Sequence, residues 1–364
     1  MLMLSYLRTA VIKNHLNTPS FLILFVTDRC NSKCKHCFNW KTLNPAKDEL
    51  SLSEIDSLAR QLPNLETLAI SGGEPFLRED ISQIYLRFYK NCKHMSSFSI
   101  PTSCLLPKKI LEKTRDILAI SNGKGIVSIN LSLDGLEKTH DYIRGVKGSF
   151  DKVFETYSLL RDLKKEFGNL VIRVNTTITN KNIGELSELI GYVKKNMPLI
   201  ESHNFEFMRG KPKDPELKCP SVDKLRDAKK VISETFDFYK YFRNSMLKSK
   251  LVNGLRSYQY DLYLRIMEEK KQLIPCYAGK VHCVVDAQAN VYFCELLPKV
   301  GNLREAESFL RIWYSDLAKS QRSSIKVKSC YCTHSCFQNG NIQFNPWLYP
   351  YILKDSLTYQ RRKK

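Results

Sequence analysis

Apolar and polar positions repeat with two different periods over the first two-thirds of the chain. Short, almost continuously apolar runs are typical of buried strands, and longer runs with apolar residues three or four apart are typical of amphipathic helices. The pattern predicts six strands, at residues 21–27, 66–71, 97–100, 126–133, 170–178 and 204–208. It predicts five helices between them, at residues 52–62, 79–91, 107–120, 150–167 and 183–196.

This alternation favours a parallel sheet with right-handed crossovers, and its six units predict an α/β fold, a partial (β/α)6 TIM-like barrel. In barrels the chemistry gathers on the loops that follow the strands. A charged helical stretch and then a cysteine-rich stretch come after the barrel. We therefore predict an N-terminal amphipathic segment, the barrel, a helical connecting region, a small cysteine-rich domain and an apolar, basic tail, at residues 1–20, 21–215, 216–272, 273–345 and 346–364.

Composition narrows the class of protein. Hydrophobic residues are 43% of the 364 residues, as in ordinary folded proteins, and no apolar run is long enough to predict a membrane span. Lysine and arginine exceed the acidic residues by 57 to 37, a net charge of +20 that favours an anionic partner. The basic residues are scattered, which argues against nucleic acid. Twelve cysteines without a secretory signal favour a cytoplasmic protein that uses them for metal binding or catalysis.

Three cysteines follow the first predicted strand, with the spacing Cys30-x3-Cys34-x2-Cys37. Three thiolates on one loop can converge on a single inorganic centre. A structural zinc ion or a simple electron-transfer cluster takes four protein ligands, so three cysteines on a four-iron cluster would leave one iron open. The alternative is a zinc site completed by His36, by His140 or by a distant cysteine.

A second motif, with Gly72, Gly73 and Glu74 before a proline, ends the second predicted strand. Two glycines allow a ligand to approach the backbone closely. The carboxylate of Glu74 would suit an ammonium group. Alone this is a common turn, but it stands one strand–helix unit after the three cysteines.

Together the two motifs resemble those of the radical S-adenosylmethionine (SAM) superfamily, over residues 22 to about 209. The resemblance implies that Cys30, Cys34 and Cys37 hold a [4Fe–4S] cluster whose open iron binds SAM. It implies an enzyme in which an electron from this cluster cleaves SAM reductively to a 5′-deoxyadenosyl radical, which abstracts hydrogen from the substrate. Gly72, Gly73 and Glu74 would position SAM.

Further residues match the family's pattern. Ser132, at the end of the fourth strand, and Arg144 would contact the SAM carboxylate, for which the guanidinium fork is apt; a surface ion pair is the alternative for Arg144. Asn175 on the fifth strand would contact the ribose. Two features depart from the pattern: His36 replaces the usual aromatic residue that touches the adenine, and residues 101–104 lack the glycine expected after the third strand.

Five cysteines gather in the predicted C-terminal domain: Cys276, Cys294, Cys330, Cys332 and Cys336. A hairpin centred on residues 288–290 would bring the first two together. The pattern resembles the SPASM/Twitch extension of radical SAM enzymes, with Ala289 in its glycine position, and implies one auxiliary [4Fe–4S] cluster. Its favoured ligands are Cys276, Cys294, Cys332 and Cys336, with Cys330 as a competitor. A zinc knuckle helped by His334 is the alternative. Buried free thiols are expected of the remaining cysteines outside the two clusters, Cys92, Cys104, Cys219 and Cys283.

The expected function is that of a radical SAM enzyme acting on an anionic, phosphorylated or lipid-linked substrate. The auxiliary cluster would assist oxidation or substrate binding, and a flavodoxin or ferredoxin would supply the electron. The alternatives are a peptide-modifying maturase and a non-enzymatic zinc or iron–sulfur protein. Glu206 and Arg209, at the end of the sixth strand, would contact substrate or form a structural ion pair.

A peripheral membrane contact is a further expectation. The N-terminal segment places apolar residues on one helical face, and the tail joins an aromatic stretch to a basic end. Together they could rest on the anionic inner membrane surface. The alternative is a helix that covers the barrel and a frayed tail.

Overall fold

The computed structural model describes residues 17–44, 48–239, 246–328 and 330–354. The first sixteen residues of the predicted amphipathic segment lie outside this range, as does the basic end of the tail. No helix in the described part of the chain is long and apolar enough to cross a membrane.

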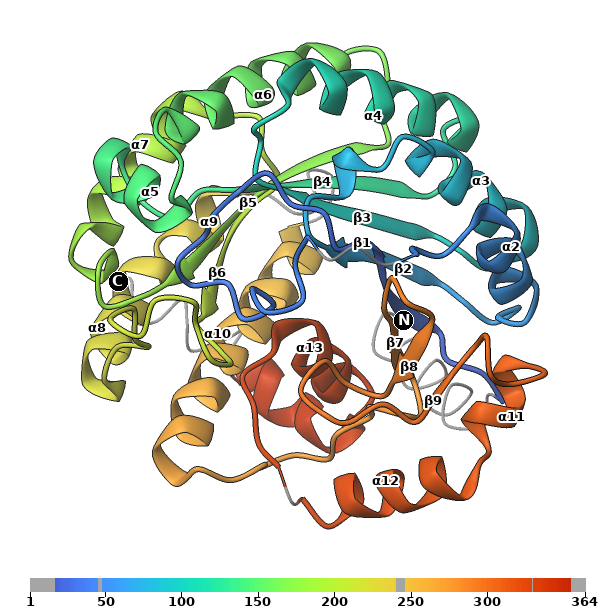
Figure 1. The fold of residues 1–364 in the computed structure, drawn as a ribbon. Coiled ribbons are helices and arrows are strands. Elements are labelled where there is room, and N and C mark those ends of the chain that lie inside the picture. Colours follow the sequence, from blue (N-terminus) through green and yellow to red (C-terminus); the bar gives the residue numbers. More distant parts are fainter. Residues whose placement is uncertain (1–16, 45–47, 240–245, 329, 355–364) are drawn as a thin grey trace.

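Six parallel strands in chain order form the curved sheet at the centre of the molecule (Figure 1). They are β1 (Phe21–Thr27), β2 (Thr67–Gly72), β3 (Ser97–Thr102), β4 (Ile126–Ser132), β5 (Leu170–Ile178) and β6 (Ser202–Phe207). Along β5, fully buried and half-buried side chains alternate, because successive residues face the outer helices and the barrel interior in turn. This confirms the predicted α/β partial barrel.

Helices cover the convex side of this sheet (Figure 1). They are α2 (Leu52–Arg60), α3 (Ile81–Asn91), α4 (Pro107–Ser121), α5 (Glu137–Arg144), α6 (Ser149–Leu163) and α7 (Leu186–Asn196), with short 3₁₀ turns η1 (Pro75–Leu77) and η2 (Ile183–Glu185). The short, polar α5 was not predicted. It ends where Gly145 adopts a left-handed conformation, with φ of 66°. A Cβ at Gly145 would lie 2.6 Å from the carbonyl oxygen of Lys33, so this glycine lets the first cysteine loop pack against α5.

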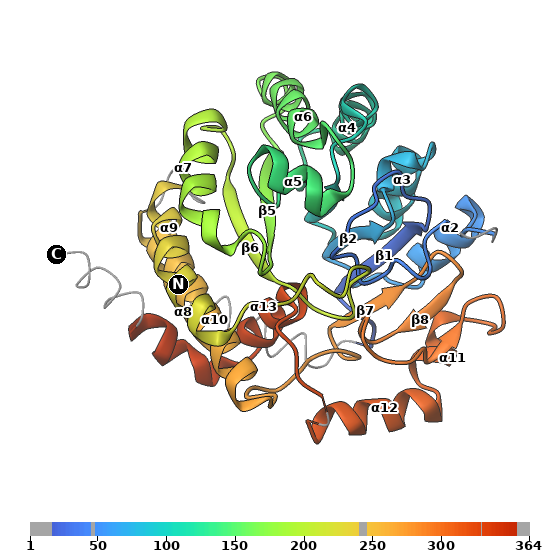
Figure 2. The same cartoon turned by 60° about the vertical axis from the view of Figure 1, so that its left-hand side comes forward.

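The remaining chain closes the open side of the barrel. Its elements are α8 (Val222–Ser233), α9 (Thr235–Phe238), α10 (Met246–Glu269), β7 (His282–Val285), β8 (Asn290–Tyr292), β9 (Gly301–Asn302), α11 (Phe309–Trp313), α12 (Asp316–Lys326), α13 (Ser335–Gln343) and η3 (Pro346–Leu348). Strand β7 pairs in parallel with β1, and β8 and β9 follow antiparallel (Figure 2). The cysteine-rich region therefore extends the barrel's own sheet to nine strands.

The predicted hairpin before Cys294 is present, with Val284 opposite Tyr292. The side chain of Asp286 holds its turn by accepting hydrogen bonds from the backbone N–H groups of Gln288 and Asn290, at 3.0 and 2.8 Å. Ala289 has φ of 68°, a conformation that glycine adopts without strain. The family motif therefore has glycine at this position because the turn requires a positive φ, and Ala289 adopts the same turn in this protein.

The described part of the tail packs against the protein. Leu348, Tyr349 and Ile352 form a small apolar cluster with Leu262 and Ile266 of α10. Two aromatic side chains of the same segment stay exposed, Trp347 and Tyr351.

Candidate active site

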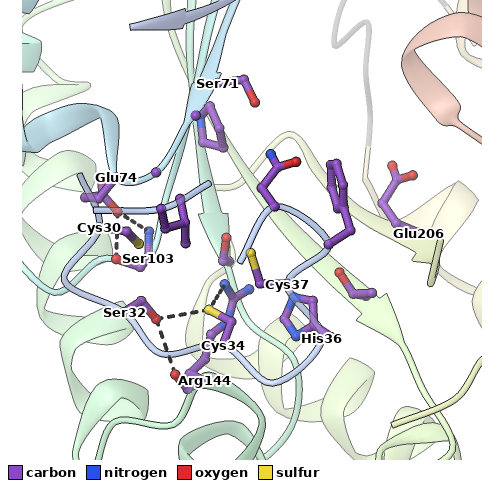
Figure 3. A pocket seen from close by; sticks show the side chains of 18 of the residues that line it. Cys30, Ser32, Cys34, His36, Cys37, Ser71, Glu74, Ser103, Arg144 and Glu206 are labelled. Atoms are coloured by element: carbon purple, nitrogen blue, oxygen red, sulfur yellow. Dashed lines mark hydrogen bonds between the residues drawn. The ribbon is translucent and has the colours of Figure 1, made fainter. Parts of the chain in front are cut away.

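A cavity of about 260 Å³ opens at the carboxyl ends of the strands. Its walls come from the first cysteine loop, the ends of β2 to β6 and the cysteine-rich region. Figure 3 shows the first cysteine loop and Ser103 around this space, with Glu206 across from them. The predicted site residues among its lining are Cys30, Cys34, His36, Cys37, Gly72, Gly73, Glu74, Ser132, Arg144, Glu206 and Arg209.

The three thiols of the first loop are half-buried at this cavity. The sulfur of Cys34 lies 3.0 Å from Ser32 Oγ, and Arg144 Nη1 donates to it at 3.5 Å. Burial raises the pKa of Cys30 to about 12 and that of Cys37 to about 11. A positively charged iron centre would displace these protons, as metal binding to cysteine does generally. Among the described residues, no group of three or more His, Cys, Asp or Glu side chains is arranged to hold a single metal ion.

Gly72 and Gly73 are required by contact between backbones. Gly73 N–H donates to the carbonyl of Thr27 at 2.8 Å, and a Cβ at Gly73 would lie 2.1 Å from the carbonyl oxygen of Arg29. Gly72 has φ of 114°, and its Cβ would lie 2.2 Å from the Thr27 carbonyl oxygen. The end of β2 can therefore pack directly on the start of the cysteine loop, which places both motifs at one cavity.

The Glu74 carboxylate fixes the loop after β3. It accepts hydrogen bonds from Ser103 N–H at 2.7 Å, from Ser103 Oγ at 2.6 Å, from Thr102 Oγ1 at 3.0 Å and from Phe76 N–H at 3.3 Å. Burial raises its pKa, although these hydrogen bonds oppose the shift. Glu74 thus shapes the cavity wall through Thr102 and Ser103.

The loop after β3 keeps a left-handed residue although it lacks the expected glycine. Cys104 is fully buried and has φ of 66°. Its N–H donates to Thr102 Oγ1 at 3.0 Å, and its carbonyl accepts from Thr156 Oγ1 at 3.2 Å. Cys104 therefore occupies the position of the missing glycine and adopts the left-handed conformation that a glycine would favour.

A buried ion pair stands beside Cys34. Arg144 Nη2 lies 2.7 Å from Asp134 Oδ2, with Arg144 8% and Asp134 0% exposed. The surface ion pair considered for Arg144 is therefore wrong: the pair is buried. Burial acts to raise the pKa of Asp134, but Arg144 and the neighbouring histidines hold it below its usual value.

Two histidines border the same carboxylate. His36 Nε2 lies 3.8 Å from Asp134 Oδ2, and burial lowers the pKa of His36 to about 4 despite that carboxylate. His140 Nδ1 accepts from Asp134 N–H at 3.0 Å, and burial lowers its pKa to about 3. Both imidazoles are therefore neutral at pH 7, and the Nδ1 atom of His36 has no partner among the described residues.

Asn175 lies away from the cavity lining, deeper in the barrel. Its side-chain oxygen accepts a hydrogen bond from Asn204 Nδ2 at 3.0 Å. Thr177, two residues further along β5, lines the cavity instead, and its N–H donates to Asp134 Oδ1 at 2.8 Å. Two positions along the strand separate the residue expected at the ribose, Asn175, from the one at the cavity, Thr177.

A second buried network joins the barrel to the cysteine-rich region. Arg209, in the loop after β6, lies 3.2 Å from Glu295 Oε2, and His334 Nε2 lies 2.8 Å from the same oxygen. Burial acts to raise the pKa of Glu295, but His334 and Arg209 lower it to about 2. Sequence reasoning missed Glu295, although its position directly after Cys294 places it beside a candidate ligand.

Three thiols of the second cluster influence one another. Burial raises the pKa of Cys276 to about 11, and the charge of Cys332 adds to this effect. Burial likewise raises the pKa of Cys294, with Cys332 and Cys276 adding to it. Cys330 is exposed. Cys336 instead faces carboxylates: burial raises its pKa to about 12, and Glu206 and Glu295 add to the effect.

The cysteines outside the two clusters are mostly buried, as expected. Cys92, Cys104 and Cys283 are buried, whereas Cys219 is half-buried. The prediction of burial is therefore incomplete for Cys219.

Comparison with known proteins agrees with this geometry. Residues 24–191 match the radical SAM superfamily. The AdoMet-dependent heme synthase of Methanosarcina barkeri (strain Fusaro / DSM 804) is 24% identical over 314 residues, which cover 82% of each chain. The antilisterial bacteriocin subtilosin biosynthesis protein AlbA of Bacillus subtilis (strain 168) is 25% identical over 295 residues, covering 80% of this chain and 58% of AlbA.

A solved structure shares the fold. Streptococcus suis SuiB bound to S-adenosylmethionine superposes with a TM-score of 0.60 at 16% identity, covering 88% of this chain and 71% of SuiB. The chain therefore contains a radical SAM domain over residues 24–191 and is an enzyme. Its cofactors are SAM and the [4Fe–4S] cluster that binds it.

The residues at the cavity fit the first cluster and SAM. Three thiols face one space, Arg144 Nε is buried without a hydrogen-bond partner among the described residues, and neutral His36 borders the same space. Thiol sulfur is the donor that iron–sulfur clusters take. A guanidinium N–H without a partner suits a carboxylate such as that of SAM.

Proposed function

We propose that Cys30, Cys34 and Cys37 hold the SAM-binding cluster, and that this enzyme abstracts hydrogen from a substrate bound in the cavity between the barrel and the cysteine-rich region. The observation that carries the proposal is the meeting of three thiols and the β2 glycine turn at one cavity. When bound, the cluster supplies the electron that cleaves SAM to a 5′-deoxyadenosyl radical. An external reductant such as a flavodoxin or ferredoxin renews that electron.

The chain's own residues would position SAM. Arg144 already pairs with Asp134 and donates to Cys34, which fixes its guanidinium and leaves Nε for the SAM carboxylate. Ser132 lines the same cavity as a second partner for that carboxylate. His36 offers a neutral ring for the adenine, because burial keeps its pKa well below 7. Gly72 and Gly73 would leave backbone groups open to SAM, while Glu74 acts by holding the neighbouring wall.

The auxiliary cluster would be held by Cys276, Cys294 and Cys332, with Cys336 as the favoured fourth ligand and Cys330 as the competitor. The mutual influence of the first three thiols supports these three, and the influence of Cys330 on Cys276 and Cys332 supports the competitor for the fourth place. Its role would be to accept an electron from the substrate or to bind the substrate. The Arg209–Glu295–His334 network would keep this region in place beside the barrel.

The proposal also concerns the chemical class of the substrate. The net charge of +20 supports an anionic, phosphorylated or lipid-linked substrate, but the two arginines that line the cavity are both paired with carboxylates. A peptide is therefore the second candidate. The role of AlbA in the biosynthesis of the bacteriocin subtilosin favours a peptide, as does a structure of SuiB bound to its precursor peptide SuiA. A cytoplasmic location and contact with the inner membrane surface remain predictions.

The test is SAM cleavage by anaerobically reconstituted protein with dithionite. The proposal expects 5′-deoxyadenosine and methionine, and a change in the cluster's electron paramagnetic resonance spectrum when SAM is added. Cys34→Ala should abolish both readouts, whereas Cys219→Ser, a half-buried cysteine outside both clusters, should keep them. SAM cleavage that persists in Cys34→Ala, or wild-type protein whose spectrum ignores SAM, would contradict the assignment.

A further inference from the structure

A second cavity lies in the cysteine-rich region, apart from the active site. It has a volume of about 500 Å³, and its walls are residues 275–280 on one side and α12 with the residue Lys328 on the other. Helix α12 lies at the outer edge of the molecule (Figure 1). This cavity shares no lining residue with the active-site cavity. Of the five cysteines of the second cluster, all of which the structure describes, Cys276 alone lines it, so it is not the space between those thiols.

Four cationic side chains line this second cavity: Lys280, Arg322, Lys326 and Lys328. No aspartate or glutamate is among the described residues that line it. None of the four cations forms an ion pair with another residue in the part of the chain that the structure describes. Lys319, on the same helix, does have a carboxylate partner and lies 2.9 Å from Asp316 Oδ1. The positive charge of the cavity is therefore not balanced by described carboxylates.

Arg322 is held in place at this cavity. Its Nε donates to the carbonyl of Gly279 at 2.6 Å, and its guanidinium carbon lies 4.6 Å from the centre of the Phe293 ring and 4.7 Å from that of Trp313. Its Nη2 atom is buried and has no hydrogen-bond partner among the described residues. Burial lowers the pKa of Arg322, and no carboxylate opposes that effect. A half-buried cation without a counter-charge is costly, so an anionic ligand is expected beside it.

We infer that this second cavity binds a phosphate group, carried by a small organic molecule or present as the free ion. A guanidinium matches phosphate oxygens, and the ammonium groups of Lys280 and Lys326 add charge beside it. A phosphate monoester carries a charge of about −1.5 to −2 at pH 7, which suits several unpaired cations better than the single charge of a carboxylate does. The volume lies within the range of small-molecule sites, about 300–1,000 Å³. The inference goes beyond the proposed function, because this binding requires neither SAM nor a radical.

The experiment is isothermal titration calorimetry on the anaerobically reconstituted protein at about 0.15 M salt, which screens non-specific charge effects. The probes are phenyl phosphate, inorganic phosphate and benzoate. Phenyl phosphate should bind with a Kd below about 1 mM and at least about tenfold more tightly than benzoate. The double variant Lys280→Gln, Lys326→Gln should weaken phosphate binding by at least about tenfold, because two charge-assisted contacts are lost. Lys319→Gln, on the same helix but outside the lining, should leave the Kd unchanged.

Phosphate binding that depends on Lys280 and Lys326 supports the inference. Tighter binding of phenyl phosphate than of inorganic phosphate assigns the site to an organic phosphate, and equal binding assigns it to the free ion. The inference is overturned if neither phosphate binds, which would leave the cations to balance the charge of a neighbouring cluster. It is also overturned if benzoate binds as tightly as phenyl phosphate, if the double variant keeps the wild-type Kd, or if Lys319→Gln loses as much affinity. Both replaced lysines are exposed, so the variant should fold and still cleave SAM.

Discussion

Replacing Arg144 with methionine tests the buried ion pair beside the first cysteine loop. Methionine keeps much of the apolar volume but removes the guanidinium that lies 2.7 Å from Asp134 Oδ2. Asp134 is 0% exposed, and the two neighbouring histidines, His36 and His140, are neutral at pH 7. A buried charge that loses its partner costs about 3–5 kcal/mol, so the free energy of unfolding should fall by that amount.

The loss should depend on pH in a defined direction. In the wild type, burial acts to raise the pKa of Asp134, but Arg144, the two histidines and the Thr177 N–H together hold it below its usual value. The pair therefore stabilises the protein above that usual value and loses this effect as pH falls through the lowered pKa. In the variant, burial has lost the strongest of the contributions that oppose it, and the pKa of Asp134 should rise above the unfolded value. Protonation then relieves part of the cost, so the deficit should be smaller at about pH 5.5 than at about pH 8.

The assay is urea unfolding under anaerobic conditions at both pH values, followed by circular dichroism. Arg161→Met is the control, because the side chains of Arg161 and its partner Asp162 are 41% and 54% exposed; it should change the free energy by at most about 0.5 kcal/mol. Adding Asp134→Asn to Arg144→Met should recover part of the loss, because the uncompensated charge is then removed. A deficit below about 1 kcal/mol for Arg144→Met, or one that is independent of pH, would refute this reasoning.

Three further changes probe the other walls of the site. Gly73→Ala should destabilise the protein by about 3 kcal/mol and abolish SAM binding, because its Cβ would meet the Arg29 carbonyl; denaturation and equilibrium dialysis measure both, and normal SAM affinity would count against it. Glu74→Gln should cost about 1–3 kcal/mol, because its amide would face the Ser103 N–H; unchanged stability by urea unfolding would show that this contact is dispensable. Cys294→Ser should reduce the iron content from about eight to about four per chain while SAM cleavage continues, and a full iron content would exclude this cysteine as a ligand.

Local periodicity was sufficient to predict the bounds of strands whose side chains are buried under the outer helices of the barrel. Both 21–27 and 170–178 were predicted residue for residue, because a β-branched, apolar run bounded by polar residues has few alternatives. Helix α5 was missed because it has eight residues and little apolar surface, so tertiary contact with the cysteine loop decides it. The pairing of β7 with β1 joins residues about 260 positions apart, which no local period reveals.

The site residues likewise divide into those that local sequence patterns predicted and those that depend on contacts between distant segments. The thiols, Gly72 and Gly73 carry motifs with fixed spacing, and the structure brings them to one cavity. Roles that depend on which neighbour a side chain meets could not be predicted. The partners of Glu74 come from the loop after the next strand, and the partner of Arg209 comes from the cysteine-rich region.

The most direct measurement of the central claim is the iron, acid-labile sulfide and zinc content per chain after anaerobic reconstitution, for the wild type and for the Cys30→Ala, Cys34→Ala, Cys37→Ala triple variant. The account predicts about eight irons with matching sulfide and no zinc in the wild type, and about four in the variant, which should no longer cleave SAM. Zinc in place of iron, or a variant that retains the full iron content, would contradict the assignment of the first cysteine loop to the SAM-binding cluster.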